Sequence, residues 1–210
     1  MAIDNESAKS SIFEGLNMIP QMKCKMTPQE YLEFERSADT KHEYFDGEIF
    51  AMTGARPNHN RISFNIAGEL KGQLKGSNCM GFTNDQRVKI EAITKYVYPD
   101  LSIACDNVEF DDDSPESLLN PVVIFEILSD STEAYDRGMK FEHYQLIDSL
   151  QEYILIAQDR CRVDKYVRNR KDGTWILSTY SDKKQIVKID AIKCDLPLSE
   201  IYDRIELKSC

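Results

Sequence analysis

The segment Val122–Leu128, with the sequence VVIFEIL, has the length and the β-branched and aromatic composition of a strand buried on both faces. Its single charged residue is Glu126. An ionised carboxylate in such a strand costs several kcal/mol unless a cation pairs with it. A metal ion can be that cation, and metal-holding carboxylates on strands are common in enzymes that cleave phosphodiesters. An ion pair in the core explains Glu126 equally well, so this segment alone leaves both possibilities open.

The length and composition of the chain predict one globular domain. The 210 residues are 41% hydrophobic and 10% aromatic, which suits a sizeable core. Residues 1–25 show no clear periodicity, so we expect an N-terminal extension there and a single domain over 26–210. No stretch approaches the ~20 apolar residues of a membrane helix, and the polar, acidic N-terminus does not resemble a secretion signal. A cytoplasmic location is therefore expected.

The charge and the cysteines narrow the choice of function. The net charge of −10 and the pI of about 4.9 argue against a broad basic surface that grips nucleic acid. They do not exclude a nuclease, because some of the acids can hold metal and basic residues can cluster locally. The six cysteines are scattered without a CxxC pair or zinc-ligand spacing, so we expect reduced, mostly buried thiols.

The apolar pattern along the chain predicts an α/β domain with a mixed sheet. A helix should begin after Thr27, which can form a capping box with Glu30. Two short strands should flank the Asp46-Gly47 turn, and a second helix should cover 59–75. Further strands are expected at 79–91, 96–105, 152–158, 161–168 and 174–180, the last three forming a C-terminal β-meander.

Asp100 is the second candidate for a functional carboxylate. It follows Pro99 at the start of an apolar strand, and Pro-Asp alone is more typical of a turn. If it lies at the height of Glu126 on a neighbouring strand, the two carboxylates can share a divalent cation, with the carbonyl of Ile127 as a third ligand. Mg²⁺ prefers such oxygen sites, and a bound ion can activate water and offset charge on phosphate.

Lys140 is the candidate for a catalytic cation. At helical spacing Arg137, Lys140 and Tyr144 share one side of a helix that Asp130 could cap. A short turn after the apolar strand should fold this side back towards Glu126. A lysine there can orient water or stabilise charge on phosphoryl oxygens, although Lys and Arg are more often found on a solvated helix face.

Other candidates are weaker when taken singly. Glu43 precedes the predicted tight turn and could add a carboxylate to the site, directly or through water. His59, Arg87 and His143 could each touch phosphate, and each residue type is more often structural or on the surface.

The order of these residues resembles a known superfamily. Pro99-Asp100, then Glu126 in an apolar strand, then a downstream lysine are similar to the PD-(D/E)XK nucleases. A more specific resemblance is to a bacterial restriction endonuclease family of largely unknown function that is abundant in cyanobacteria. It covers about 26–187 and rests on HEYFDGE at 42–48, Pro57 and His59, YPDLS at 98–102, FEILSDST at 125–132 and YDRGMK at 135–140.

The resemblance implies an αβββαβ restriction-endonuclease-like core, a Mg²⁺ or Mn²⁺ site and DNA as substrate. Carried over to this chain, Asp100 and Glu126 would be metal ligands and Glu43 an accessory acid. The superfamily usually places a lysine two residues after the strand acid, where this chain has Leu128. In this family the lysine has moved to the following helix, where Lys140 stands.

The leading hypothesis is a metal-dependent DNA endonuclease that acts as a homodimer, since restriction-type folds usually cut both strands as dimers and symmetric dimers are the commonest oligomers. The alternative is a catalytically silent member of the fold that serves as a binding or regulatory module, which the acidic pI and the missing strand lysine favour. A third, weaker option is a metal-dependent hydrolase of another phosphate ester or nucleotide.

Overall fold

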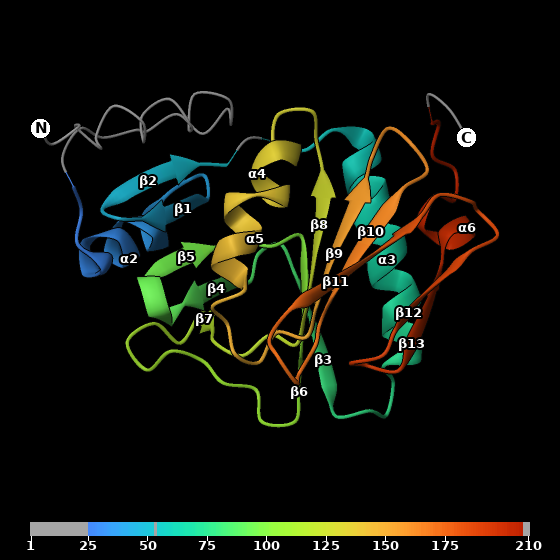
Figure 1. The fold of residues 1–210 in the computed structure, drawn as a ribbon. Helices are drawn as coiled ribbons and strands as arrows, with labels where there is room; N and C mark the ends of the chain where they lie inside the picture. Colours follow the sequence, from blue (N-terminus) through green and yellow to red (C-terminus); the bar gives the residue numbers. More distant parts are fainter. Residues whose placement is uncertain (1–24, 53, 208–210) are drawn as a thin grey trace, which may run out of the picture.

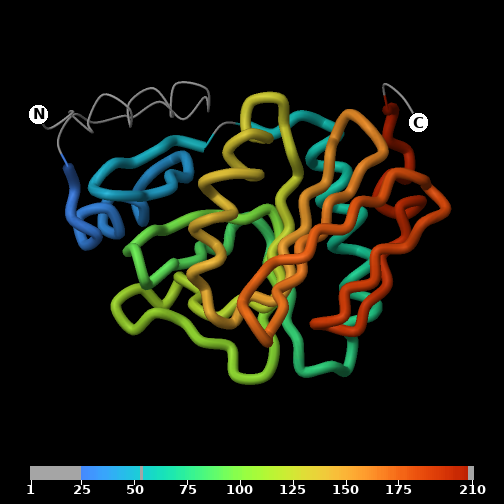
Figure 2. Tube along the Cα trace, viewed as in Figure 1, coloured from blue at the N-terminus to red at the C-terminus, as the bar shows by residue number. Residues whose placement is uncertain are grey.

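The computed structural model describes residues 25–52 and 54–207, and these form a mixed α/β fold (Figure 1). The predicted N-terminal extension therefore lies almost entirely outside the described residues. The predicted α/β class is confirmed, with the strands distributed over two larger sheets and one hairpin. The Cα trace places the β1–β2 hairpin and the C-terminal strands at opposite ends, with the chain around residue 126 between them (Figure 2).

The six-stranded sheet contains the apolar strand predicted at 122–128. Its order is β11-β10-β9-β8-β6-β3, in which β8 pairs in parallel with β9 and antiparallel with β6. Every residue of β8 is buried, as expected for a strand covered on both faces. The strands of this sheet are β3 (Cys79–Thr83), β6 (Leu101–Cys105), β8 (Val123–Leu128), β9 (Glu152–Ala157), β10 (Val163–Arg168) and β11 (Trp175–Tyr180).

The second sheet carries the N-terminal hairpin. Its order is β2-β1-β5-β4-β7, and the turn between β1 and β2 has positive φ at both Asp46 (50°) and Gly47 (83°), which suits a tight hairpin. The predicted hairpin is thus confirmed. The strands are β1 (His42–Phe45), β2 (Glu48–Ala51), β4 (Arg87–Ile90), β5 (Lys95–Val97) and β7 (Ser117–Leu118), while β12 (Ile186–Ile189) and β13 (Cys194–Pro197) form a separate hairpin.

Helices cover both faces of β8, and the period of two along the strand sorts its side chains between them. Helix α3 (Pro57–Gln73) packs its buried Ile62, Ile66 and Leu70 into the core that contains Phe125 and Ile127. On the opposite face, α5 (Met139–Tyr144) covers the core that contains Leu128. Glu126 therefore faces α5. The remaining helices are α2 (Pro28–Ser37), the 3₁₀ turn η1 (Glu91–Ile93), α4 (Glu133–Arg137) and α6 (Leu198–Ile201).

The start of the two short helices after β8 differs from the prediction. The capping box of α2 between Thr27 and Glu30 is confirmed. Asp130, however, does not cap the later helix: α4 follows Thr132 as its N-cap, and Thr132 makes no side-chain cap bond. Gly138 then separates α4 from α5 with φ −107° and ψ −106°, outside the helical region.

The expectation that all the thiols are reduced is wrong for one pair. Cys79 on β3 and Cys105 on β6 stand directly opposite each other in the strand register and form a disulfide. Their spacing of 26 residues gives no hint of this pairing, because it depends on the register of two strands. Cys161 and Cys194 are buried, as expected, and Cys24 and Cys210 lie outside the described part of the chain. Within 25–52 and 54–207, no helix is long and apolar enough to cross a membrane.

Candidate active site

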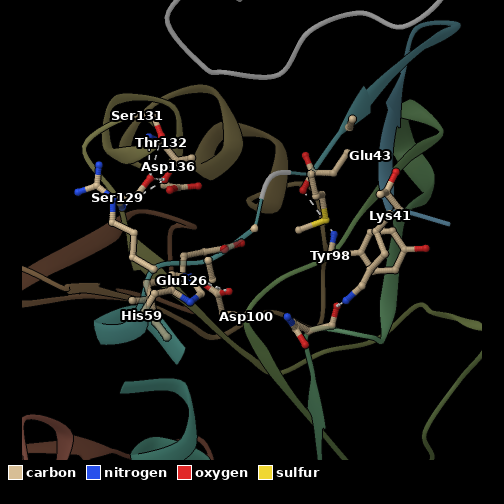
Figure 3. Close-up of a pocket in the computed structure, with 18 of the residues that line it drawn as sticks. Lys41, Glu43, His59, Tyr98, Asp100, Glu126, Ser129, Ser131, Thr132 and Asp136 are labelled. Carbon is tan, nitrogen blue, oxygen red and sulfur yellow. Dashed lines mark hydrogen bonds and ion pairs between the residues drawn. The ribbon is translucent and has the colours of Figure 1, made fainter. Parts of the chain in front are cut away.

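The predicted site residues line one cavity of about 1030 Å³. It opens where β8 ends and β6 begins, between the start of α3, the strand β1 and the helices α4 and α5. Figure 3 shows Asp100, Glu126 and His59 grouped together, with Glu43 on the other side of the cavity and Asp136 above. The candidates Glu43, Asp100, Glu126, Ile127 and Lys140 all line it, so the structure brings together residues that lie far apart in the sequence.

Asp100 lies beside Glu126 because of the strand register. Leu101 on β6 pairs antiparallel with Phe125 on β8, which places Asp100 opposite Glu126. The main-chain N–H of Ile127 donates a hydrogen bond of 2.7 Å to Asp100 Oδ2, which fixes the carboxylate against β8. The prediction that the two acids stand at matching heights on neighbouring strands is confirmed.

Glu126 is paired with Lys140 in the buried interior. Lys140 Nζ lies 2.7 Å from Glu126 Oε1, and the hydroxyl of Tyr144 donates to the same oxygen over 2.9 Å. Burial raises the pKa of Glu126 well above its usual value, although the charge of Lys140 opposes this effect. The predicted approach of Lys140 to Glu126 from the following helix is confirmed.

Lys140 forms ion pairs with more than one carboxylate. Its Nζ also lies 3.6 Å from Glu43 Oε1 and 3.6 Å from Asp136 Oδ1. Burial alone would lower the pKa of Lys140, but the attraction of Glu126, Glu43 and Asp136 raises it well above its usual value, so the ammonium keeps its charge. One ammonium faces three buried acids, so a further positive charge would be electrostatically favourable in this site.

Asp136 gives this site a measurable pH dependence. Burial raises its pKa to about 6, more than the nearby Lys140 lowers it. In the unfolded chain an Asp titrates near 3.9, so between these values the folded protein binds more protons and its stability falls as the pH rises. Asp136→Asn removes this titration. From about pH 4 to 6.5 we expect the stability of the wild type to fall relative to Asp136→Asn on the order of 2 to 3 kcal/mol. Urea unfolding at stepped pH measures the difference, and parallel pH curves would contradict the prediction.

Two residues have a larger part in the site than the sequence indicated. Asp136 is one helical turn before Lys140, at the i,i+4 spacing that could have marked it as a partner. His59, in the first turn of α3, lies with Nε2 3.1 Å from Asp100 Oδ1. Burial alone would lower the pKa of His59, but the hydrogen bond and the charge of Asp100 outweigh it and raise that pKa.

The weaker candidates Arg87 and His143 stay outside this cluster, and so does Arg137, which the helical spacing had placed on the same side as Lys140. Arg137 pairs with Glu133 and Asp164 instead of facing Glu126 with Lys140. The buried guanidinium of Arg87 bonds mainly to hydroxyl groups, those of Ser114, Ser117 and Tyr98. His143 lies against the ammonium of Lys95. Arg87 and Arg137 therefore have structural partners, as their residue types often do.

The donor atoms can be tested against the requirements of a metal ion. Among the residues that the structure describes, no group of three or more His, Cys, Asp or Glu side chains is arranged to hold one. Mg²⁺ needs fewer protein ligands, since one or two carboxylates suffice when waters and substrate complete its shell. Asp100 and Glu126 supply two carboxylates, and the carbonyl of Ile127 points to the same side of β8 as its N–H, towards Asp100. The buried Oε2 of Glu43 lacks a hydrogen-bond partner within the described chain. This set of hard oxygen atoms fits Mg²⁺ or Mn²⁺.

Comparisons with known proteins identify the family. A family model described as "Putative restriction endonuclease" (Uma2) matches residues 28–199. The uncharacterized proteins slr1290 and sll1609 of Synechocystis sp. (strain ATCC 27184 / PCC 6803 / Kazusa) are 38% and 34% identical to this chain. The matches cover 79% and 80% of this chain and 86% and 94% of those proteins. A crystal structure from Anabaena variabilis ATCC 29413, described as a "putative nuclease belonging to DUF820", has the same fold, with a TM-score of 0.71, 16% identity and coverage of 86% of this chain and 99% of its own. This chain belongs to the Uma2 "Putative restriction endonuclease" family.

Proposed function

We propose that this protein is a metal-dependent endonuclease that hydrolyses DNA phosphodiester bonds. The observation that carries the proposal is the arrangement of Asp100, immediately before β6, opposite Glu126 on β8, with Lys140 Nζ 2.7 Å from Glu126. Membership of a family described as restriction endonucleases and the nuclease-like fold support the same class of reaction.

The residues that line the cavity would have different roles in this reaction. Asp100, Glu126 and the carbonyl of Ile127 would hold Mg²⁺ or Mn²⁺. When bound, the ion supplies a Lewis acid for the phosphoryl oxygens and lowers the pKa of a bound water. Lys140 can donate hydrogen bonds to the attacking water or to the scissile phosphate, because an ammonium has three donors. Glu43 Oε1 lies 3.6 Å from that ammonium and helps to hold it.

Two basic residues on the rim can contact the phosphates on either side of the scissile bond. Lys41 and Arg56 line the cavity and pair with the exposed acids Asp85 and Asp130. Exposed ion pairs contribute little to stability, so a phosphate can replace either carboxylate at low cost.

We also propose that the protein is a homodimer, because cutting both strands of a duplex requires two such sites. Light scattering on the purified protein measures its mass and tests this proposal.

Metal titration tests the proposed function. With Mg²⁺ or Mn²⁺ the purified protein should nick supercoiled plasmid DNA, and EDTA should stop the reaction. In calorimetry, Mn²⁺ should give a binding heat that Glu126→Gln loses, because the substitution removes one ligand charge while keeping the side-chain size. Asp111→Asn is a matched control: this buried acid pairs with Lys89 outside the cavity, so its loss should leave the heat unchanged.

One observation favours the alternative of a catalytically silent module. Lys140 already neutralises Glu126 at 2.7 Å, so the pair is satisfied without an ion. A silent module would give no metal heat that depends on Glu126 and no cleavage at any metal concentration. Products from RNA or nucleotides but none from DNA would instead indicate hydrolysis of another phosphate ester.

A further inference from the structure

A second buried lysine, Lys95, contacts Tyr135, one of the residues that line the cavity. Lys95 on β5 is 2% exposed, and its Nζ lies 2.6 Å from the hydroxyl of Tyr135 and 2.9 Å from His143 Nδ1. The rings of Phe45 and Tyr135 each have their centroid 5.1 Å from this ammonium. Lys140 has three acids within 4 Å, whereas Lys95 forms no ion pair with any residue in 25–52 or 54–207. Its position is therefore set by two hydrogen bonds and by the ring of Phe45.

The hydrogen bonds of Lys95 have a fixed direction. A charged ammonium can only donate, so the oxygen of Tyr135 and Nδ1 of His143 must both accept. Tyr135 retains its own proton, because burial, followed by the charge of Glu43, raises the pKa of this phenol well above its usual value. With Lys95 behind it, the O–H of Tyr135 has to point elsewhere.

The O–H of Tyr135 can donate a hydrogen bond into the cavity. Tyr135 lines the cavity, and within the described chain no acceptor bonds its O–H. Its ring centroid lies 6.0 Å from Lys140 Nζ, so the ring that carries this hydroxyl lies beside the Lys140 ammonium. Donors aimed at a phosphoryl group stabilise the charge that develops on its oxygens during hydrolysis.

We propose that Tyr135 is a catalytic residue that donates a hydrogen bond to a non-bridging oxygen of the scissile phosphate, and that Lys95 is the positioning residue that directs this hydroxyl into the cavity. The proposal rests on the proposed nuclease function. It adds to that function a donor that is independent of the metal ligands and of Lys140.

The arrangement depends on the charge of Lys95. Burial lowers the pKa of Lys95 to about 8. Burial and the charge of Lys95 lower the pKa of His143 to about 4, so near neutral pH His143 is uncharged and its Nδ1 can accept. The charged groups that act on Lys95 are Glu43 on β1, Lys140 on α5, Glu126 on β8 and Asp136 on α4.

Above about pH 8 a neutral Lys95 amine can itself accept a hydrogen bond. The O–H of Tyr135 can then turn back to Lys95 and leave the phosphate. The contribution of Tyr135 is therefore present while Lys95 is protonated and is lost as the pH rises through about 8.

The test is the ratio of cleavage rates of the wild type and Tyr135→Phe, measured with Mg²⁺ and plasmid DNA from about pH 6.5 to about 9.5. The ratio cancels every titration that the two proteins share, including that of a metal-bound water. We expect a ratio on the order of 10² at neutral pH, typical for loss of one such donor, and a fall towards one above about pH 9. Lys95→Met should lower the neutral-pH rate towards that of Tyr135→Phe.

Tyr31→Phe is the matched control. Tyr31 is as deeply buried and loses one hydrogen bond, from its hydroxyl to the carbonyl of His42. It does not line the cavity, so the wild-type rate should be retained at each pH.

The outcomes separate this inference from the proposed function. A folded Tyr135→Phe that cleaves like the wild type at every pH overturns the inference and leaves the nuclease assignment intact. A large ratio that does not change with pH supports the role of Tyr135 and overturns that of Lys95, even if Lys95→Met fails to fold. A wild type that neither cleaves plasmid DNA nor binds a single-stranded oligonucleotide with Ca²⁺ overturns the proposed function and this inference with it.

Discussion

Asp100→Asn and Glu126→Gln will each abolish metal-dependent cleavage of plasmid DNA, lowering the rate by at least about 10²-fold. Each substitution removes one charge from the proposed metal ligands while keeping the size of the side chain. Asn at 100 can still accept the hydrogen bond from the N–H of Ile127, and Gln at 126 can still accept from Tyr144. The fold should therefore persist. Nicking of supercoiled plasmid, with thermal unfolding of each variant, measures both effects.

Glu152→Gln is the matched control for Glu126→Gln. Glu152 lies on the neighbouring strand β9, is 1% exposed and pairs with Lys165 at 3.5 Å, but it does not line the cavity. Its loss removes a buried carboxylate from the same sheet and should leave the cleavage rate unchanged. If folded Asp100→Asn and Glu126→Gln also cleave like the wild type, the metal-ligand roles are wrong.

The sequence predicted those parts of the fold that depend on local pattern. Residues 123–128 of the apolar run form a strand buried on both faces because no polar residue interrupts it except Glu126. Helix α3 shows its core face through the spacing of Ile62, Ile66 and Leu70. The break at Gly138 and the Cys79–Cys105 bridge follow from tertiary packing and strand register, which no single window of sequence contains.

The residues of the candidate site also differ in how well the sequence could place them. Asp100 and Glu126 could be placed together because the order of Pro99-Asp100 and the apolar strand that carries Glu126 resembles that of the PD-(D/E)XK nucleases. His59 could not be placed, because its contact with Asp100 depends on how α3 packs across the sheet. Lys95 gave no signal, since an isolated lysine in a short strand has the appearance of a surface residue, and Tyr135 entered only as part of the YDRGMK motif at 135–140.

Lys140→Met will destabilise the folded protein by about 3 to 5 kcal/mol at about pH 7, as is typical when one partner of a buried ion pair is removed. The substitution keeps most of the apolar stem but leaves the carboxyl groups of Glu126, Glu43 and Asp136 without their shared cation. Urea unfolding measures the loss. A change below about 1 kcal/mol would mean that Lys140 does not hold these acids together.

The double variant Lys140→Met/Glu126→Gln should recover part of this stability, because it removes the carboxylate that lies closest to the missing ammonium. Mn²⁺ provides the decisive comparison. In the single variant Lys140→Met, Mn²⁺ can replace the lost positive charge and should raise the free energy of unfolding by mass action, whereas the double variant lacks the Glu126 ligand and should respond less. Equal responses would show that the ion binds elsewhere. A response that depends on Glu126 would mean that the ammonium and the metal act on the same carboxylate, so that Lys140 holds the site together until metal and substrate arrive.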